Sequence, residues 1–311
     1  MRTRLLSAIA SILVAAMAIC APGRTGAAAA AQRTFPTAEP AAQALVAAAG
    51  ANDAAALLAL FGPEGEPLVS SGDPVRDEKE RQRFAARAAE AIRIEERDPD
   101  YATIYVGADD WPCAIPLVRK NGAWHFDTAA GKEEALNRRI GGNELHAIDV
   151  CRAFAAAERE YFAADRDGDG VREYAQRILS SDGMRDGLYW PVADGEPRSP
   201  MGPLVASAAA EGYTRPEVGR GPKAYHGYLY RVLTGQGGNA PGGAKSYIEN
   251  GNMTRGFALL AYPIEYGQSG IMTFVVNQQG IVFQKDLGER TAELASAITV
   301  YDPDKSWVPA R

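Results

Sequence analysis

The 311-residue sequence is poor in the residue types on which many catalytic and redox sites depend. It holds 3 cysteines and 3 histidines, and it contains no HExxH, CxxC or GxSxG pattern. These absences argue against a zinc peptidase, a dithiol redox protein and a serine hydrolase. Beyond its first residues, the sequence has no apolar run near the roughly eighteen residues that a membrane-spanning helix needs.

Basic side chains are also fewer than acidic ones. Lysine and arginine together number 33 against 39 aspartate and glutamate, which gives a net charge of −6. An acidic surface repels nucleic acid and anionic lipid and tolerates cations. We therefore expect no nucleic-acid partner, and we expect the partner to be an envelope protein or ligand whose identity the sequence does not give.

The start of the chain has the pattern of a secretory signal. Arg2 and Arg4 precede an apolar segment from Leu5 to Ile19, and small residues follow from Ala27 to Ala31. This order predicts a signal peptide over residues 1–31. We expect the mature chain to be in the periplasm or secreted, with no transmembrane helix after cleavage.

The three cysteines leave two questions open. Cys20 allows a lipoprotein alternative, although Ile19 before it is larger than a lipid-attachment site prefers. In an oxidising compartment Cys113 and Cys151 can pair, but a chain of this length does not need a disulfide. The alternative is that both are small buried apolar residues.

The first half of the mature sequence predicts helices followed by a small antiparallel sheet. Asn52 or Asp53 is placed to cap one helix, and Asp73 with Pro74 is placed to begin another that runs to about Glu96. From residue 101 the apolar period changes to two. The predicted elements are helices over 41–49, 54–61 and 74–96 and strands over 101–107, 113–120 and 123–127.

The second half predicts a long helix followed by an antiparallel meander. Residues 128–134 resemble a linker, and apolar residues three or four apart predict a helix over 133–163. Gly141 and Gly142 interrupt that pattern, so we expect a kink or two helices there. The later elements are predicted strands over 225–233, 256–266, 270–277 and 280–287 and a helix over 289–298. The fold class is therefore α+β, with a domain over 32–130 and a second over 131–311.

The clearest chemical pattern follows the predicted long helix. Asp165, Asp167 and Asp169 alternate along the chain, and Gly170 follows them. Alternating carboxylates followed by glycine occupy the first, third, fifth and sixth positions of a calcium loop of the EF-hand type. Glycine there permits the sharp turn that directs several oxygens at one hard cation.

The remaining positions of that template are only partly filled. Val171 offers a carbonyl at the seventh position and Glu173 a carboxylate at the ninth, but Gln176 stands where an EF-hand has its bidentate glutamate. The alternative is a solvated turn, since aspartate and glycine are ordinary turn residues. The candidate ligands of calcium, the one expected cofactor, are Asp165, Asp167, Asp169, Val171 and Glu173.

Two other patterns carry a weaker chemical signal. His125 and Asp127 lie on the same side of a predicted strand, which suits an acid/base pair or a structural pair. The glycine-rich stretch over 235–256 matches neither a dinucleotide fingerprint nor a phosphate loop in context, which indicates a surface loop. Together they define the alternative function, a periplasmic hydrolase of envelope material with the loop as its lid.

Long segments of the sequence resemble the bacterial family called domain of unknown function 2950. The segments include SGDPVRDE, WPCAIPLVRKNGAWHFDTAAGKEE, NRRIGGNELHAI, DRDGDGVREYAQ, DGLYWP, YHGYLYRVLTGQG, APGGAKSYIENGNM and GFALLAYPIEYG. The resemblance covers essentially the whole mature chain. It implies an exported bacterial protein and carries over no catalytic residue.

Residues 143–286 are also similar to the globular part of type II secretion pseudopilins, in which a long helix packs on an antiparallel meander. The sequence lacks the exposed N-terminal helix with which those proteins build a fibre. We therefore expect a non-enzymatic binding or assembly-support module of the envelope rather than a fibre subunit.

Overall fold

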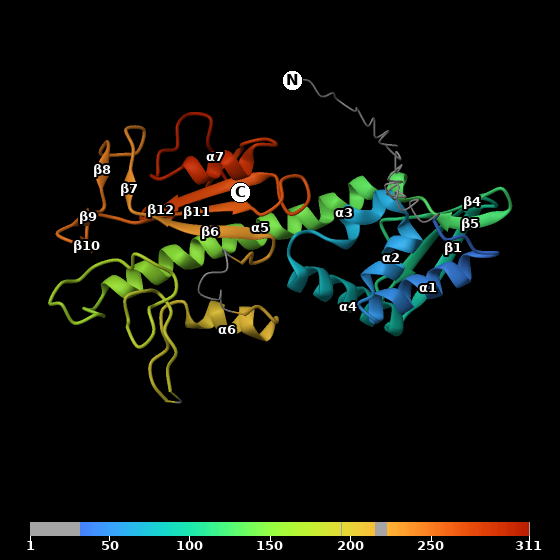
Figure 1. The fold of residues 1–311 in the computed structure, drawn as a ribbon, viewed down its shortest axis with the longest axis horizontal. Helices are drawn as coiled ribbons and strands as arrows, with labels where there is room; N and C mark the ends of the chain where they lie inside the picture. Colours follow the sequence, from blue (N-terminus) through green and yellow to red (C-terminus); the bar gives the residue numbers. More distant parts are fainter. Residues whose placement is uncertain (1–31, 194, 215–222, 311) are drawn as a thin grey trace, which may run out of the picture. The chain divides into compact units, whose positions relative to one another are not determined.

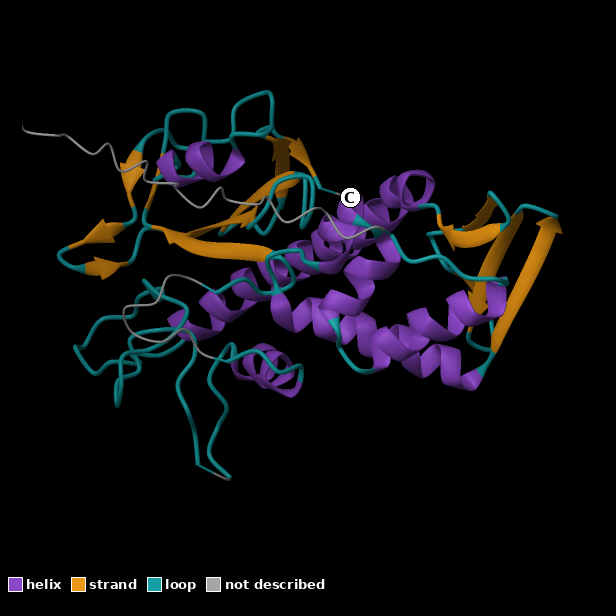
Figure 2. Ribbon diagram, turned by 45° about the vertical axis from the view of Figure 1, so that its right-hand side comes forward, coloured by secondary structure: helices purple, strands orange, loops and turns teal. Residues whose placement is uncertain are grey.

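The computed structural model describes residues 32–193, 195–214 and 223–310, and the statements below concern these residues. Helices and antiparallel sheets make an α+β fold, as the sequence predicts (Figures 1 and 2). The predicted signal peptide over 1–31, with Cys20, lies outside the described residues.

The first half of the described chain combines helices with an antiparallel sheet. Its helices are α1 (Ala38–Gly50), α2 (Ala54–Phe61), the 3-10 helix η1 (Pro63–Gly65), α3 (Glu66–Val69) and α4 (Pro74–Glu90). Its strands are β1 (Ile92–Asp98), β2 (Tyr101–Val106), β3 (Trp111–Pro112), β4 (Leu117–Lys120) and β5 (Ala123–Phe126). The strand order is β1-β2-β4-β5, and β3 pairs with β2.

The local signals of this half act as predicted at several points. Asp53 caps α2 by accepting the backbone N–H of Ala56, and Asp73 caps α4 by accepting that of Arg76. Asn121 and Gly122 both have positive φ, 54° and 79°, in the hairpin between β4 and β5. Positive φ at both positions is the reason why Asn-Gly favours such a turn.

The predicted helix from Asp73 to Glu96 is too long. Helix α4 ends at Glu90, and the chain continues as strand β1. Ile92 pairs with Val106 and Ile94 with Ile104 in the antiparallel register of β1 and β2. Cross-strand pairing with β2 decides the conformation of this charged segment, where helix propensity alone favours a longer helix.

A single helix, α5 (Thr128–Phe162), replaces the predicted linker and interrupted helix. Asp127 starts it by accepting the backbone N–H of Ala130 at 3.1 Å. Gly131 lies so close to the segment before β4 that a Cβ there would be 2.5 Å from Ile115 Cα. Gly141, in contrast, has open space around it. The linker prediction was wrong because residues 128–134 form the packed first turns of α5.

Helix α5 contributes to both halves of the described chain. Near its start it contacts η1 and α3, and farther along it contacts the strands β11 (Ala258–Pro263) and β12 (Met272–Asn277). One cluster of buried apolar side chains draws on residues 35–126 and a second on residues 147–301. The boundary that the sequence analysis places between its two domains, at residues 130 and 131, lies inside α5.

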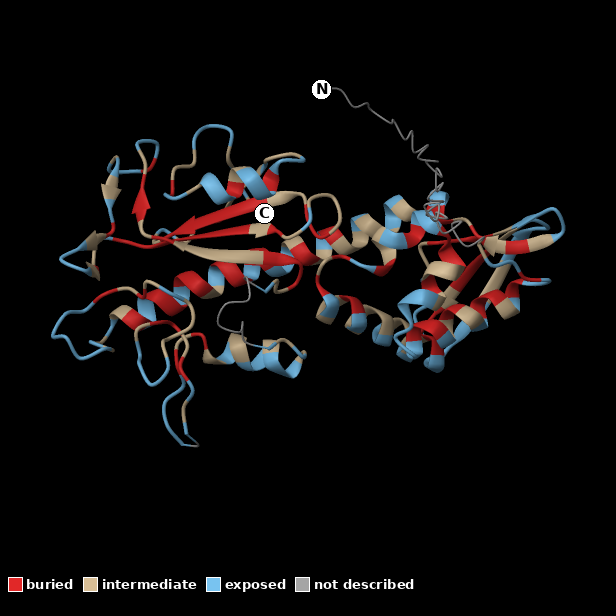
Figure 3. Ribbon diagram, viewed as in Figure 1, coloured by how far each residue is buried: buried red, intermediate tan, exposed pale blue. Residues whose placement is uncertain are grey.

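The second half is an antiparallel sheet covered on both faces. Its strands follow the order β14-β13-β12-β11-β6, with β6 (Tyr228–Leu233), β13 (Phe283–Asp286) and β14 (Val308–Pro309). Helix α5 packs on one face and α7 (Thr291–Ala297) on the other (Figure 1). Residues 258–261 of β11 are completely buried on both faces, which is why this strand is a continuous apolar run (Figure 3).

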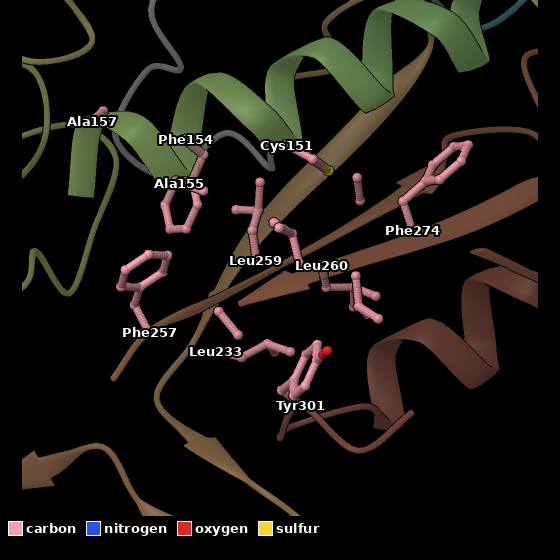
Figure 4. Packing of buried hydrophobic residues seen from close by; sticks show 14 of the residues in the cluster. Cys151, Phe154, Ala155, Ala157, Leu233, Phe257, Leu259, Leu260, Phe274 and Tyr301 are labelled. Atoms are coloured by element: carbon pink, nitrogen blue, oxygen red, sulfur yellow. The ribbon is translucent and has the colours of Figure 1, made fainter. Parts of the chain in front are cut away.

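Aromatic and aliphatic side chains fill the space between α5 and this sheet (Figure 4). Phe154 of α5 meets Phe257 edge to face, with ring centroids 5.8 Å apart, and Cys151 lies above the strands. Edge-to-face rings add about 0.5–1.5 kcal/mol beyond the area that they bury. The sequence did not predict the short elements α6 (Gly202–Ala210), β7 (Gly235–Gln236), β8 (Lys245–Ser246), β9 (Ile248–Glu249) and β10 (Asn252–Met253).

A buried aspartate joins segments far apart in the sequence. Asp73, 2% exposed, accepts hydrogen bonds from the hydroxyl of Tyr213 and from the backbone N–H of Gly227, each at 2.9 Å. It also caps α4 through Arg76. One carboxylate therefore satisfies three donors from three parts of the chain.

Candidate metal centre

The aspartate loop begins where α5 ends. Arg166 closes the helix by donating to the carbonyls of Glu160 and Tyr161, two of the acceptors that a helix end leaves without an internal partner. The loop is therefore attached to a long, well-packed helix on its N-terminal side.

The three predicted carboxylates converge. One oxygen from each of Asp165, Asp167 and Asp169 lies within 4.8 Å of the others, and all three residues are exposed. Two oxygens on one calcium ion can be at most about 5 Å apart, because each calcium–oxygen distance is about 2.3–2.6 Å. The spacing of these oxygens therefore fits a shared cation.

Backbone N–H groups hold the loop in this shape. Asp165 accepts from Gly168 at 2.7 Å and from Gly170 at 2.9 Å, and these bonds lower the pKa of its carboxyl group. Both glycines have positive φ, 86° and 88°. The exposed Val171 donates its N–H to Asp169 at 2.7 Å. Within the described residues, none of the three aspartates belongs to an ion pair.

Contacts from about 80 residues farther along the chain connect the loop to strand β10. Asn252 donates its side-chain amide to Asp169 at 2.5 Å, and the backbone N–H of Met253 donates to Glu173 at 2.9 Å. Gln176 donates its side-chain amide to the carbonyl of Gly251 at 2.7 Å. The loop thus lies between the end of α5 and the β9–β10 hairpin.

Two glutamates beside the loop are buried. Glu173 is 9% exposed, and burial raises its pKa, with the charges of Asp167 and Asp169 acting in the same direction. Glu158 of α5 is completely buried, and burial raises its pKa well above the ordinary value. One of its oxygens accepts from the N–H of Ala175 at 2.8 Å, and the other has no hydrogen-bond partner among the described residues.

The loop is not an EF-hand. An EF-hand has a helix on each side of its loop, whereas in the described residues from Val171 to Ser199 no helix follows. The segment instead makes isolated β-bridges, one between Tyr174 and the distant Met253 of β10 and one between Leu179 and the nearby Tyr189.

The acid/base pair of the hydrolase alternative lies where the β4–β5 hairpin leads into α5. Asp127 is the cap of α5, where it accepts from the N–H of Ala130. His125 lies opposite Val118 in the β4–β5 hairpin. Neither residue lines the cavity among α1, α2, α4 and α5 or four other cavities of the described chain. The hydrolase alternative stays a prediction.

A histidine pair not predicted by the sequence lies near Asp73. His146 of α5 stacks on His226, with ring centroids 4.1 Å apart. Glu211 approaches the Nε2 atom of His226 at 3.2 Å and Arg76 its Nδ1 atom at 3.3 Å. Burial lowers the pKa of His226 to about 3, with His146 and Arg76 acting in the same direction. The only sequence signal was the aromatic surroundings of His226, because the partners come from distant segments.

The other predicted features are accounted for without a ligand. Cys113 and Cys151 both carry free thiols, and burial raises the pKa of Cys151 to about 12. The glycine-rich stretch over 235–256 forms the short strands β7 to β10 and their turns. No helix of the described chain has the length and apolar character needed to cross a membrane.

Comparison with known proteins identifies a family. No curated protein and no solved structure matches this chain, so the similarity to pseudopilins stays a prediction. Residues 32–309 match the family described as "Protein of unknown function (DUF2950)", which covers nearly all of the described chain. The chain therefore belongs to this family.

Proposed function

We propose that the protein is an exported, non-enzymatic binding or assembly-support module of the bacterial envelope, in which the loop from Asp165 to Glu173 holds a structural calcium ion. The convergence of three carboxylate oxygens within 4.8 Å of one another carries the proposal. The expected location in the periplasm or outside the cell rests on the predicted signal peptide over residues 1–31.

Electrostatics supports a bound cation. Like-charged carboxylates at this separation repel one another. Neutral N–H donors offset part of this repulsion, from Gly168 and Gly170 at Asp165 and from Val171 and Asn252 at Asp169, but none of these donors carries a positive charge. A calcium ion supplies the missing positive charge and matches the preference of hard cations for oxygen ligands.

The position of the loop suggests what the ion does. The N-terminal side of the loop continues from α5, and its C-terminal side is bonded to Asn252 and Met253 of β10. An ion held by the aspartates fixes the end of the long helix relative to the β9–β10 hairpin. A long helix packed on an antiparallel meander is also the arrangement that motivates the pseudopilin-like, assembly-support part of the proposal.

Calorimetric titration with calcium tests this function. We expect one site per chain, binding tighter than millimolar, and a rise in melting temperature that a chelator reverses. Asp167→Asn should weaken binding at least tenfold, whereas Asp182→Asn, which removes a similarly exposed charge outside the loop, should not. Absence of binding below millimolar calcium, or equal effects of the two substitutions, would refute the structural role of the loop.

A further inference from the structure

A cavity far from the aspartate loop lies among α1, α2, α4 and the beginning of α5. Its volume is about 240 Å³. An apolar cavity of about 150 Å³ already holds a benzene molecule, so this one has room for a ligand of roughly ten heavy atoms. The apolar side chains that line it include Leu45, Leu57, Phe61, Val69, Phe84 and Ile115.

The charged side chains around the cavity are mainly basic. Arg81, Arg83, Arg87 and Arg139 line it together with two acids, Asp77 and Glu80. In a chain whose net charge is −6, this local excess of positive charge is unusual. Convergent polar groups on an otherwise apolar wall are typical of a small-molecule site.

Two of these arginines are held by neutral acceptors. Arg139 of α5 donates to the carbonyls of Pro67 and Leu68, each at 2.6 Å. Arg81 of α4 donates to the side chain of Asn52 at 2.6 Å and to the carbonyl of Val69 at 2.9 Å. Among residues 32–193, 195–214 and 223–310, neither guanidinium is in an ion pair.

The nearby acids are already engaged. Buried Asp77 accepts from the N–H and the hydroxyl of Ser71, at 2.9 and 2.7 Å. Glu80 pairs with Arg76 at 3.1 Å and with Arg83 at 3.7 Å. Burial lowers the pKa of Arg139, and the opposing effects of Asp77 and Glu80 do not cancel it. The Arg139 charge is therefore desolvated without a carboxylate of its own.

From this geometry we propose that the cavity binds a medium-chain alkyl carboxylate, with its tail on the apolar wall and its head group at Arg139 and Arg81. Guanidinium groups favour carboxylates because two parallel N–H donors match the two oxygens. Pre-positioning by backbone carbonyls reduces the side-chain entropy that is lost when the ligand binds.

Calorimetry with octanoate tests the site on the full mature chain. Octanol keeps the tail without the charge, and acetate keeps the charge without the tail. We expect octanoate to bind at least tenfold tighter than either and to weaken as salt is added. Octanol binding as tightly as octanoate, or no octanoate binding below millimolar concentration, would overturn the proposal.

Three substitutions locate the binding. Arg139→Gln removes the charge and should weaken octanoate at least tenfold. Ala135→Phe, at a lining position of α5, should fill the cavity and weaken it similarly with Arg139 still present. The control Arg152→Gln removes an exposed arginine of the same helix and should leave the affinity unchanged. If Arg139→Gln does not fold, Ala135→Phe decides, and unchanged affinity in that variant would refute the proposal.

Cys113 provides an independent readout because it lines the same cavity. Its partly exposed thiol should react slowly with iodoacetamide, since burial raises its pKa, whereas Cys151 is completely buried. Octanoate should slow the alkylation of Cys113 at least severalfold at saturation, and octanol at the same concentration should not. Alkylation at the same rate with and without octanoate would contradict binding in this cavity.

Discussion

Replacing Asp73 with alanine should destabilise the protein more than removal of an ordinary helix cap. The Asp73 carboxylate caps α4 through the N–H of Arg76 and also accepts from Tyr213 and Gly227. Alanine removes all three acceptor contacts and leaves the Tyr213 hydroxyl and the Gly227 N–H without this partner. Asp53 is the matched control, because among the described residues its exposed side chain accepts only the N–H of Ala56 in α2.

The size of the effect follows from the number of donors. Loss of an N-cap costs about 1 kcal/mol, and this is the whole effect expected for Asp53→Ala. Each buried donor left unsatisfied costs about 1–3 kcal/mol, so loss of the cap and of two such partners in Asp73→Ala should lower the free energy of unfolding by about 3–7 kcal/mol in total.

Urea unfolding of the wild type and both variants, followed by tryptophan fluorescence and circular dichroism, measures the difference. Asp73→Asn keeps one acceptor oxygen and should fall between wild type and Asp73→Ala. If Asp73→Ala is no less stable than Asp53→Ala, the carboxylate does not join the distant segments, and the reasoning fails.

Two further predictions concern α5. Gly131→Ala should destabilise the protein by about 1–3 kcal/mol, because the new Cβ would lie 2.5 Å from Ile115 Cα. Gly141→Ala should stabilise it by about 0.5–1 kcal/mol, because the space around Gly141 is open and alanine favours a helix over glycine. Thermal melts in which Gly131→Ala is the more stable variant would contradict this packing. Burial raises the pKa of Glu158, so the native state keeps a proton that the unfolded state releases, and this contribution to stability is lost as pH rises above about 4.3. Glu158→Gln keeps an acceptor for the N–H of Ala175 and should therefore gain stability relative to wild type as pH rises above about 4.3 in urea titrations. A difference independent of pH would argue against a buried ionisable group.

The sequence predicted the helix caps, the hairpin turn and the longer strands, because each of these depends mainly on residues that are neighbours in the chain. Asp53 and Asp73 are recognisable as caps because a short acceptor before a helical pattern satisfies free N–H groups. The Asn121-Gly122 hairpin is recognisable because both residues accept positive φ. The strands β6, β11, β12 and β13 of the second sheet follow from runs of β-branched and aromatic residues, whereas the two-residue strand β14 was not predicted.

Non-local contacts decided the elements that were predicted wrongly. Strand β1 has too many charges to stand out, and its pairing with β2 is not visible in its own sequence. The Gly141-Gly142 pair suggested a break, yet α5 continues through it because packing along its length outweighs about 1 kcal/mol for each glycine.

The residues of the candidate site also fall into two groups, those that the sequence predicts and those that only the fold brings to the loop. Asp165, Asp167 and Asp169 lie within five residues of one another, so the sequence was sufficient to name them. Asn252 and Met253, which join the loop to β10, lie about 80 residues away, and no motif connects them to it.

Crystals grown with calcium, with the anomalous signal of the ion recorded, test the central claim most directly. The account predicts one calcium peak per chain, with oxygens of Asp165, Asp167 and Asp169 at about 2.3–2.6 Å. It also predicts that Glu173 keeps its bond to the N–H of Met253 or gives one oxygen to the ion. A structure at millimolar calcium with no peak in the loop, or with a peak bound by only one of the three aspartates, would contradict it.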